Sequence, residues 1–478
     1  MEHVVTRFAP SPTGFMHIGS VRTALFAFLW ARKNKGTFIL RIEDTDKERE
    51  VAGSVAHIQE SLSWLNLTWD YGPQMSTPFG SCIQSERLPT YHAAARELIA
   101  KGYAYPDPYS AEEIDGFRRA AQANKEVFLF RKHRPKTFSE WDGKRPLRFL
   151  VPEIKRYEWH DEVRGDLSAG EEALDDFILI KGDGYPTYNF AHIIDDMHMG
   201  VTHVMRGDEF ISSTPKFLSL YDALGIKRPK LVTLPPILRE DKTKKLGKRD
   251  GAKDLLEYRK EGFLPAAMIN FLAFIGWHPG SDRELFTLPE LIEAFDISTI
   301  QTHGGSANEE KLLWFQHQHV KHLSDSEYKA AVMQSVFSGK EPENEERWNT
   351  ILPLVRERAA LSSTFTAEID AGEYAYFFTA PEIDITLLPN KNSTLEVCRT
   401  HLKKILEILS SSDFSSVDSI KSAAWDYASQ EGRGDVLWPL RYSLSGKKQS
   451  PDPFTIAHVL GKEETLARIT GALNQIHA

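Results

Sequence analysis

Cysteine is nearly absent from this sequence. Its 478 residues contain only Cys82 and Cys398, which lie far apart, so neither a disulfide framework nor a four-cysteine zinc site is available. This composition fits a reducing compartment, and we expect a cytoplasmic protein without zinc. Long apolar runs are absent too: none approaches the ~20 residues that a membrane-spanning helix needs. The N-terminal stretch MEHVVTRF enters a predicted strand at once, which leaves no room for a secretory or transit peptide.

Positive charge is also in deficit. Lysine and arginine number 58 against 67 acidic residues, and the formal net charge is −9. This balance argues against a non-specific nucleic-acid binder, because such proteins use an excess of cations to neutralise phosphates. Any contact with a polyanion must therefore come from a local basic surface. The length and the 41% hydrophobic content still allow large cores, and we expect three or more domains of ~100–200 residues each.

The stretch from Val5 to Ser20, VTRFAPSPTGFMHIGS, organises the N-terminal part of the chain. It predicts a short strand, a stiff loop rich in proline and glycine, and the start of an amphipathic helix. The loop delivers His17 to the beginning of that helix, where unpaired backbone N–H groups and the macrodipole attract anions. This arrangement suits the phosphates of a nucleotide.

A second strand is predicted in TFILRIEDTD, whose C-terminal end carries three carboxylates. A helix from Ser54 to Leu65, with Ser54 as its N-cap, should follow it. Alternating strands and helices indicate a parallel sheet that binds ligands at the carboxyl ends of its strands. After an α+β insertion, we expect this sheet to resume at FILIK, residues 177–181. In the insertion, the basic run RKHRPK either contacts phosphates or forms a solvated loop.

The second half of the chain is different in character. The stretch DKTKKLGKRDGAKDL, from Asp241 to Leu255, taken alone predicts a mobile basic loop. The segments GFLPAAMINFLAFIGW and LPELIEAFDISTI have the spacing of amphipathic helices, and past about His322 one predicted helix follows another.

Several motifs together resemble one family. RFAPSPTGFMHIGS is similar to the first signature of the class I aminoacyl-tRNA synthetases, in the form typical of the bacterial-type glutamyl enzymes, which carry a serine where Ser20 stands. KKLGKRDGA resembles their lysine signature, usually KLSKR or KISKR, with Gly247 in place of the serine. Between the two, RIEDTD, SERLPTYHAAARELIAKGYAY, GYPTYNFAHIIDD and VMRGDEF match in order and separation. The resemblance covers at least two-thirds of the chain.

The resemblance to glutamyl-tRNA synthetases implies an enzyme that ligates L-glutamate to tRNA(Glu), using ATP with Mg²⁺ and forming a glutamyl-adenylate. It implies these catalytic residues: His17, Ser20, Lys245 and Lys248. It implies that ATP contacts these: Pro10, Ser11, Gly14, His17, Gly19, Glu209 and Lys248. It implies that glutamate contacts these: Arg7, Ala9, Ser11, Glu43, Tyr188, His192 and Arg206. For His192, a structural role stays open. Arg358 is implied to accept cytosine and exclude guanine at the third anticodon base.

The implied fold is an α/β Rossmann-like nucleotide-binding domain with an α+β insertion, followed by a helical stem-contact domain and all-α anticodon-binding domains. The expected domains are 1–81 with 177–240 for the Rossmann domain, 82–176 for the acceptor-stem-binding insertion, 241–322 for the lysine loop and stem-contact helices, and 323–478 for two anticodon-binding subdomains that meet near residue 375. Some relatives build a zinc knuckle in the insertion, but residues 83–180 contain no cysteine. We expect a monomer that does not bind membranes.

Several alternatives stay open. The protein could also charge tRNA(Gln), belong to the glutaminyl or glutamyl-queuosine type, act as a nucleotidyltransferase without tRNA, or be an inactive paralogue. A nucleotidyltransferase does not require the long helical half, and both His17 and Lys248 are present for chemistry. Glutaminyl relatives end in β-barrels, whereas this C-terminal half shows no alternating strands. Its aromatic residues either stack on anticodon bases or pack in a core: Tyr374, Tyr376, Phe377, Phe378 and Trp438.

Overall fold

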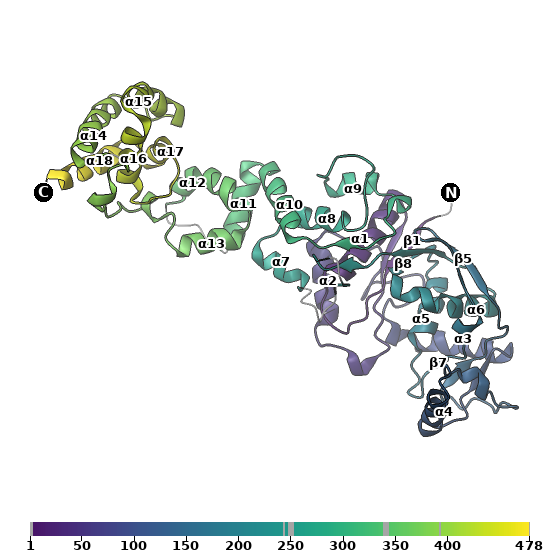
Figure 1. Ribbon diagram of the computed structural model, residues 1–478. Helices are drawn as coiled ribbons and strands as arrows, with labels where there is room; N and C mark the ends of the chain where they lie inside the picture. The colour runs from purple at the N-terminus through teal and green to yellow at the C-terminus, as the bar shows by residue number, and fades with distance from the viewer. Residues whose placement is uncertain (1–2, 242–243, 247–252, 338–343, 392, 478) are drawn as a thin grey trace. The chain divides into compact units, whose positions relative to one another are not determined.

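The computed structural model describes residues 3–241, 244–246, 253–337, 344–391 and 393–477 (Figure 1). The chain divides into two compact units, Met1–His319 and Val320–Ala478. The first unit contains strands and helices, whereas the described residues of the second form helices and loops only. Within these described ranges, no helix combines the length and the hydropathy that crossing a membrane demands.

Two pairs of parallel strands form the centre of the first unit: β1 (Val5–Phe8) with β2 (Thr37–Leu40), and β8 (His203–Gly207) with β9 (Lys230–Leu234). Helix α1 (Ile18–Lys33) connects the first pair and α6 (Thr214–Leu224) connects the second. β1 lies beside β8, where the Thr202 backbone N–H donates to Val5 O at 2.9 Å. From the contact between β1 and β8, the first pair extends to one side and the second pair to the other, so the order of the strands reverses there. Open parallel sheets bind ligands at such a point.

The first two helices follow the predicted apolar spacing, with one difference at a cap. In α1 the buried side chains include Val21, Leu25 and Phe28, and in α2 (Ser54–Trp64) they include Ile58 and Leu62. The prediction that Ser54 is the N-cap of α2 is wrong. Gly53 takes that position with φ of +80°, a left-handed conformation that favours glycine. The Ser54 hydroxyl instead donates to Gly14 O at 2.9 Å, which ties α2 to the proline-rich loop.

The middle of the chain returns to the central sheet through a hairpin that the sequence did not single out. β5 (Tyr157–Asp161) pairs in parallel with β9, and β6 (Gly165–Ala169) pairs antiparallel with β5 at the edge. The strand predicted in FILIK exists as β7 (Ile178–Ile180), but it pairs with β4 (Leu147–Phe149) instead of the central strands. A short apolar run predicts a buried strand without specifying its partner. The domain boundaries themselves stay predictions.

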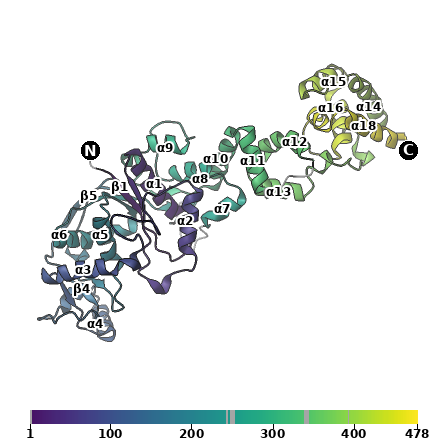
Figure 2. The ribbon, with the colours of Figure 1, turned by 180° about the vertical axis from the view of Figure 1, so that it is seen from behind.

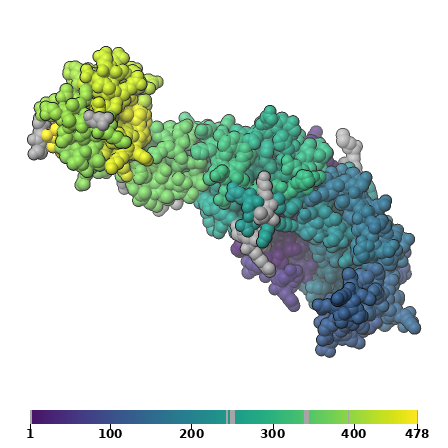
Figure 3. All heavy atoms as spheres, in the orientation of Figure 1, coloured from purple at the N-terminus to yellow at the C-terminus, as the bar shows by residue number. Residues whose placement is uncertain are grey.

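The insertion is built around a small antiparallel sheet in the order β3–β4–β7, where β3 is Ala104–Pro106. Helix α4 (Ala111–Ala123) follows β3, and α3 (Leu88–Ala100) lies beside α5 (Tyr188–His198) in both views (Figure 1 and Figure 2). In Figure 3 the blue surface of the insertion adjoins the purple surface of the N-terminal segment. At the start of the insertion, the Ser85 N–H donates to Asp44 Oδ1 of the N-terminal segment at 2.8 Å.

One buried carboxylate, that of Asp176, holds several segments of the insertion together. The fully buried Asp176 accepts hydrogen bonds from Arg134 at 2.6 Å, from the Tyr105 hydroxyl at 2.8 Å and from Val151 N at 3.0 Å. Arg131 donates to Leu174 O. Both arginines of the run RKHRPK are therefore bonded within the insertion, whereas its two lysines, Lys132 and Lys136, are exposed.

Helices and two short parallel strands follow β9. The strands are β10 (Ile237–Leu238) and β11 (Gly305–Ser306), and the helices are α7 (Leu255–Glu261), α8 (Pro265–Ala273), α9 (Leu288–Ala294) and α10 (Glu309–His322), of which α8 and α9 pack on α1. Buried Arg22 of α1 donates to Ile275 O at 3.0 Å and to Pro235 O. Burial lowers the pKa of Arg22 to about 10. This side chain fastens the helix after His17 to the segment that follows β9.

The second unit is a set of helices: α11 (Asp325–Ser335), α12 (Glu345–Arg358), α13 (Ser362–Asp370), α14 (Leu395–Ser410), α15 (Val417–Glu431), α16 (Arg433–Ser445), α17 (Pro453–Leu460) and α18 (Lys462–His477). Tyr374, Tyr376 and Phe377 are at most 5% exposed. Trp348 contacts the rings of Tyr374 and Phe378. These aromatic residues therefore pack in the helical core.

We expect Asp176→Asn to destabilise the first unit by ~2–3 kcal/mol, because an amide would face donors from Arg134, Tyr105 and Val151 in a buried site. Urea-induced unfolding measures this loss. Glu126→Gln is the matched control, since it removes a carboxylate of the same insertion from an exposed pair with Lys132 and should leave the midpoint unchanged. Equal midpoints for the two variants would contradict the role of Asp176.

Candidate active site

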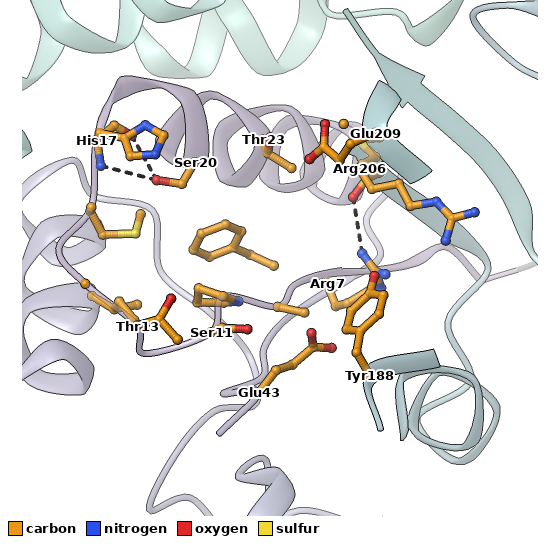
Figure 4. A pocket seen from close by; sticks show the side chains of 18 of the residues that line it. Arg7, Ser11, Thr13, His17, Ser20, Thr23, Glu43, Tyr188, Arg206 and Glu209 are labelled. Carbon is orange, nitrogen blue, oxygen red and sulfur yellow. Dashed lines mark hydrogen bonds between the residues drawn. The ribbon is translucent and has the colours of Figure 1, made fainter. Parts of the chain in front are cut away.

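A cavity of about 490 Å³ lies at the carboxyl ends of β1 and β8, where the chain order reverses. Most of the predicted site residues line it: Arg7, Ala9, Pro10, Ser11, Gly14, His17, Ser20, Glu43, Tyr188, Arg206 and Glu209. Figure 4 shows Arg7, Glu43 and Tyr188 together on one side, and His17 with Ser20 across from them. The cavity thus has a charged end and an end formed by the start of α1.

His17 caps α1 with its own side chain. Its Nδ1 accepts a hydrogen bond from Gly19 N at 3.1 Å, and its backbone N–H donates to the Ser20 hydroxyl at 3.2 Å. This is a capping box in which histidine takes the place of the usual serine or threonine. Because Nδ1 accepts, the proton of the neutral ring is on Nε2. A Cβ on Gly19 would lie 2.9 Å from His17 Cε1, so the ring needs a glycine there.

A buried ion network holds the charged end. Fully buried Arg41 donates to Asp196 Oδ1 at 2.6 Å and to Glu43 Oε1 at 2.9 Å. Asp196 Oδ1 also accepts from Arg7 Nε at 3.1 Å, and Arg7 Nη1 donates to Met205 O. Burial alone would raise the pKa of Asp196, but Arg41 and Arg7 outweigh it and lower the pKa to about 2. Burial raises the pKa of Glu43 in spite of the two arginines.

Arg206 has no carboxylate partner among the residues that the structure describes. It is 8% exposed, donates to Thr214 Oγ1 at 3.3 Å, and lies over the rings of Phe210 and Phe217 at 5.4 and 4.9 Å. Burial lowers the pKa of Arg206. Since a buried charge is costly without a counter-ion, this guanidinium is suited to an anionic ligand.

Tyr188 lines the cavity, whereas His192 packs behind it. The His192 Nδ1–H donates to Tyr188 O at 2.7 Å, and the two rings stack at 4.7 Å with 15° between their planes. Its other neighbour is the edge of Phe217. Burial lowers the pKa of His192 to about 3, so the ring is neutral near neutral pH. His192 therefore supports the tyrosine and does not itself line the cavity.

The lysine signature approaches the cavity through Lys245. Its Nζ lies 2.8 Å from Glu209 Oε2 and 3.7 Å from Asp208 Oδ1. Burial would raise the pKa of Glu209, but the hydrogen bond and charge of Lys245 outweigh it and lower that pKa. Lys245 is thus paired with a carboxylate of the cavity wall. Gly247 and Lys248 lie outside the described residues.

Sequence reasoning missed part of this site. Thr23 lines the cavity three residues after Ser20 on α1, so helical spacing could have found it. Asp196, which holds Arg7, stands in the stretch IIDD, but nothing in the sequence names its partner. No group of three or more His, Cys, Asp or Glu side chains within the described ranges is arranged to hold a metal ion.

The predicted anticodon residue lies in the second unit. Arg358 is the exposed last residue of α12. Its neighbour Arg356 is tied down instead, because it donates to Val320 O at 3.1 Å, to Lys321 O at 3.0 Å and to Asp325 at 3.0 Å. Of the two arginines, Arg358 is therefore the one available to a partner.

Two families of known proteins match the chain. Residues 3–314 match the tRNA synthetases class I (E and Q), catalytic domain, and residues 317–473 match the anticodon binding domain. The chain therefore belongs to the class I tRNA synthetases of the glutamate and glutamine type.

Individual relatives narrow this assignment. The chain is 37% identical to a glutamate–tRNA ligase from Anaeromyxobacter sp. (strain K), over 99% of this chain and 98% of that relative. It is also 37% identical to one from Clostridium kluyveri, over 100% of this chain and 99% of the relative. The crystal structure of a glutamate tRNA ligase from Elizabethkingia meningosepticum in complex with its amino acid matches with a TM-score of 0.88 at 34% identity, covering 99% and 100% of the two chains. Within its class, the chain belongs to the glutamate–tRNA ligase family.

The buried neutral state of His192 predicts a pH dependence of stability. The unfolded imidazole titrates near 6.5 and the folded one near 3, so between these values the unfolded state binds more protons and stability is lost as the pH falls. We expect this group to remove up to ~1.4 kcal/mol per pH unit between roughly pH 6 and pH 4. His192→Asn should lack this slope in urea unfolding at pH 7, 6 and 5. Parallel pH profiles in the two proteins would contradict the assignment.

Proposed function

We propose that the protein ligates L-glutamate to tRNA(Glu) at this cavity, first forming glutamyl-adenylate from glutamate and ATP and then transferring the glutamyl group to the terminal ribose. The observation that carries the proposal is Arg206, buried and without a carboxylate partner among the described residues. The charge of Arg7 is balanced by Asp196, and that of Glu43 by Arg41. One positive charge is left over, which complements the net single negative charge of glutamate and not the neutral glutamine.

Glutamate presents two carboxylates and one ammonium to this end of the cavity. We assign the ammonium to Glu43, which can bind it through charge-assisted hydrogen bonds, and the carboxylates to Arg206 and Arg7. Tyr188 forms the wall between them, and its ring is fixed by stacking on His192. Ala9 and Ser11 bring small side chains into the same wall, which lets the substrate approach the backbone.

The first step needs little acid–base chemistry. An unperturbed carboxyl titrates near ~4, so the substrate carboxylate is ionised at neutral pH and can attack the α-phosphate of ATP directly. Catalysis is then mainly positioning and charge stabilisation. We assign the phosphates to the start of α1, which His17 caps and where the helix has its positive end. Pro10, Gly14 and Gly19 shape this loop for close approach.

Lysine and magnesium complete the charge balance in this proposal. Lys245 is paired with Glu209 at the cavity wall, and Lys248 is assigned from the family signature alone. Both would neutralise charge that develops on the α-phosphate and on pyrophosphate. Mg²⁺ is expected to enter with ATP, since it usually binds through one or two carboxylates together with substrate phosphates. Glu209 lines the cavity, and Asp208 and Glu209 both lie within 4 Å of Lys245 Nζ, so these carboxylates are candidates for that contact.

The second step requires tRNA, and the match of residues 317–473 to an anticodon binding domain favours it over a nucleotidyltransferase that works without tRNA. We assign the acceptor stem to the insertion, residues 82–176, and the anticodon to the helical region from residue 323. A ribose hydroxyl then attacks the adenylate and releases AMP. The protein is expected to act in the cytoplasm as a monomer.

ATP–pyrophosphate exchange tests the proposed function directly. The wild-type protein should exchange label when glutamate, Mg²⁺ and tRNA(Glu) are present, and should not do so with glutamine. The same assay without tRNA shows whether this step requires bound tRNA. Formation of glutamyl-tRNA should follow with tRNA(Glu). Exchange with glutamine alone would overturn the assignment of the substrate.

We expect Arg206→Gln to lower kcat/KM for glutamate by at least ~100-fold, about 3 kcal/mol, because a substrate carboxylate loses its buried partner. The KM for ATP should stay within about twofold of wild type. Arg228→Gln is the matched control, since it makes the same charge change at an exposed pair with Asp222. Unchanged glutamate kinetics in Arg206→Gln would place this arginine outside the binding site.

The choice of tRNA gives a separate prediction. A guanidinium offers only donors, which suits the acceptor atoms of cytosine at the third anticodon position, and in this proposal the same side chain crowds the larger guanine. Arg358→Gln should therefore let the enzyme charge tRNA(Gln) while exchange with glutamate stays unchanged. Lys403→Gln, a change at another exposed cation of the second unit, should leave the choice of tRNA as in wild type. If the wild-type enzyme charged both tRNAs equally, the discriminating role would be wrong.

A further inference from the structure

A histidine outside the predicted site joins the two signature segments. His57 lies on α2, next to the cavity-lining Ile58, and its side chain is 11% exposed. Its Nε2 lies 2.8 and 3.0 Å from the two carboxylate oxygens of Asp254. Its Nδ1 accepts a long hydrogen bond of 3.4 Å from Met16 N, and Phe15 stacks on the ring at 4.5 Å. The imidazole therefore contacts both the segment before His17 and the segment after the lysine signature.

Asp254 is itself anchored at this point. Its Oδ1 accepts from Leu256 N at 2.9 Å and so caps α7. The next residue, Leu255, donates its N–H to Met16 O at 3.0 Å, and an antiparallel bridge pairs Asp254 with His17. The backbone of the first signature loop is thus held against Asp254 by direct pairing and, from the other side, by His57.

The two ring nitrogens of His57 have different roles. Nε2 faces a carboxylate and so carries the proton, whereas Nδ1 faces the Met16 N–H and so must be the acceptor. A proton on Nδ1 would oppose the Met16 N–H. The Ser61 hydroxyl, 3.4 Å from Nδ1, is a further polar neighbour. With its proton on Nε2, the ring therefore connects Met16 to Asp254, and this connection requires both hydrogen bonds.

We propose that His57 is a positioning residue for adenylate formation, which fixes Met16 and His17 relative to Asp254. The inference rests on the proposed function. Catalysis by alignment is sensitive to small displacements, and a shift of ~1 Å in a positioning element can cost up to ~100-fold in rate. Glu43, Arg206 and Tyr188 lie at the other end of the cavity, so loss of His57 should lower kcat without changing how glutamate binds.

The test separates the two ends of the bridge. His57→Asn places an amide near the Nδ1 position and keeps an acceptor for Met16, but does not reach Asp254. His57→Gln extends to the Nε2 position and keeps a donor for Asp254, but loses Met16. Because the proposal needs both contacts, each variant should lower the kcat of ATP–pyrophosphate exchange at least ~10-fold, as should His57→Ala. KM for glutamate should stay within about twofold.

Glu60→Ala is the matched control, because Glu60 joins the same two helices, α2 and α7, through an exposed pair with Arg259 at 2.9 Å. This variant should keep the wild-type rate, and melting temperatures should show that all variants are folded. If His57→Ala does not fold, the Asn and Gln variants decide the outcome.

A rate within about twofold of wild type for Asn or Gln would overturn the inference, and so would a rise in KM for glutamate that matches the loss in rate. A wild-type protein that is inactive with glutamate would instead overturn the proposed function.

Discussion

One buried carboxylate, Asp196, fixes the charged end of the active site. It accepts from Arg7 on β1 and from Arg41 just after β2, and Arg41 in turn holds Glu43. Burial alone would lower the pKa of Arg41, but the neighbouring carboxylates outweigh it and raise that pKa. Such a cluster is costly unless its charges pair closely. Because Asp196 belongs to α5, the network sets the position of two strand ends against one helix.

The neighbouring Asp195 connects α5 to the insertion in the same way, through buried hydrogen bonds. It accepts from Arg87 Nε at 2.8 Å, from the Tyr91 hydroxyl at 2.9 Å and from Gln84 at 2.8 Å, all at the beginning of the inserted segment. Consecutive side chains of α5 thus serve different purposes: Asp196 faces the substrate end and Asp195 faces the insertion. A displacement of α5 would therefore disturb the proposed glutamate site and the placement of the insertion together.

The sequence predicted which residues line the cavity much better than it predicted their partners. The first signature, RIEDTD and VMRGDEF place Arg7, Glu43 and Arg206 correctly at strand ends, because strand–loop–helix punctuation and the family motifs are local features. Pairing between distant segments has no comparable local signal in the sequence. The partner of β7, the capture of Arg134 by Asp176 and the contact of His57 with Asp254 all depend on the folded topology. Even the N-cap of α2 is Gly53 and not the predicted Ser54, because the backbone is left-handed at that residue.

The same distinction between local and long-range features explains why the sequence predicts one end of the cavity better than the other. The end that we assign to phosphate is formed by one continuous stretch, in which His17, Gly19 and Ser20 cap the helix that they begin, so its geometry depends on four consecutive residues. The end that we assign to glutamate is formed by β1, the segment after β2, α5 and β8, and its charge balance becomes clear only when the pairing of Asp196 with Arg7 and Arg41 is known. Only when these ion pairs are known does Arg206 stand out as a positive charge without a carboxylate partner among the described residues. In the proposed function, specificity for an acidic substrate therefore depends on the folded charge network, while nucleotide binding depends on a local stretch of the chain.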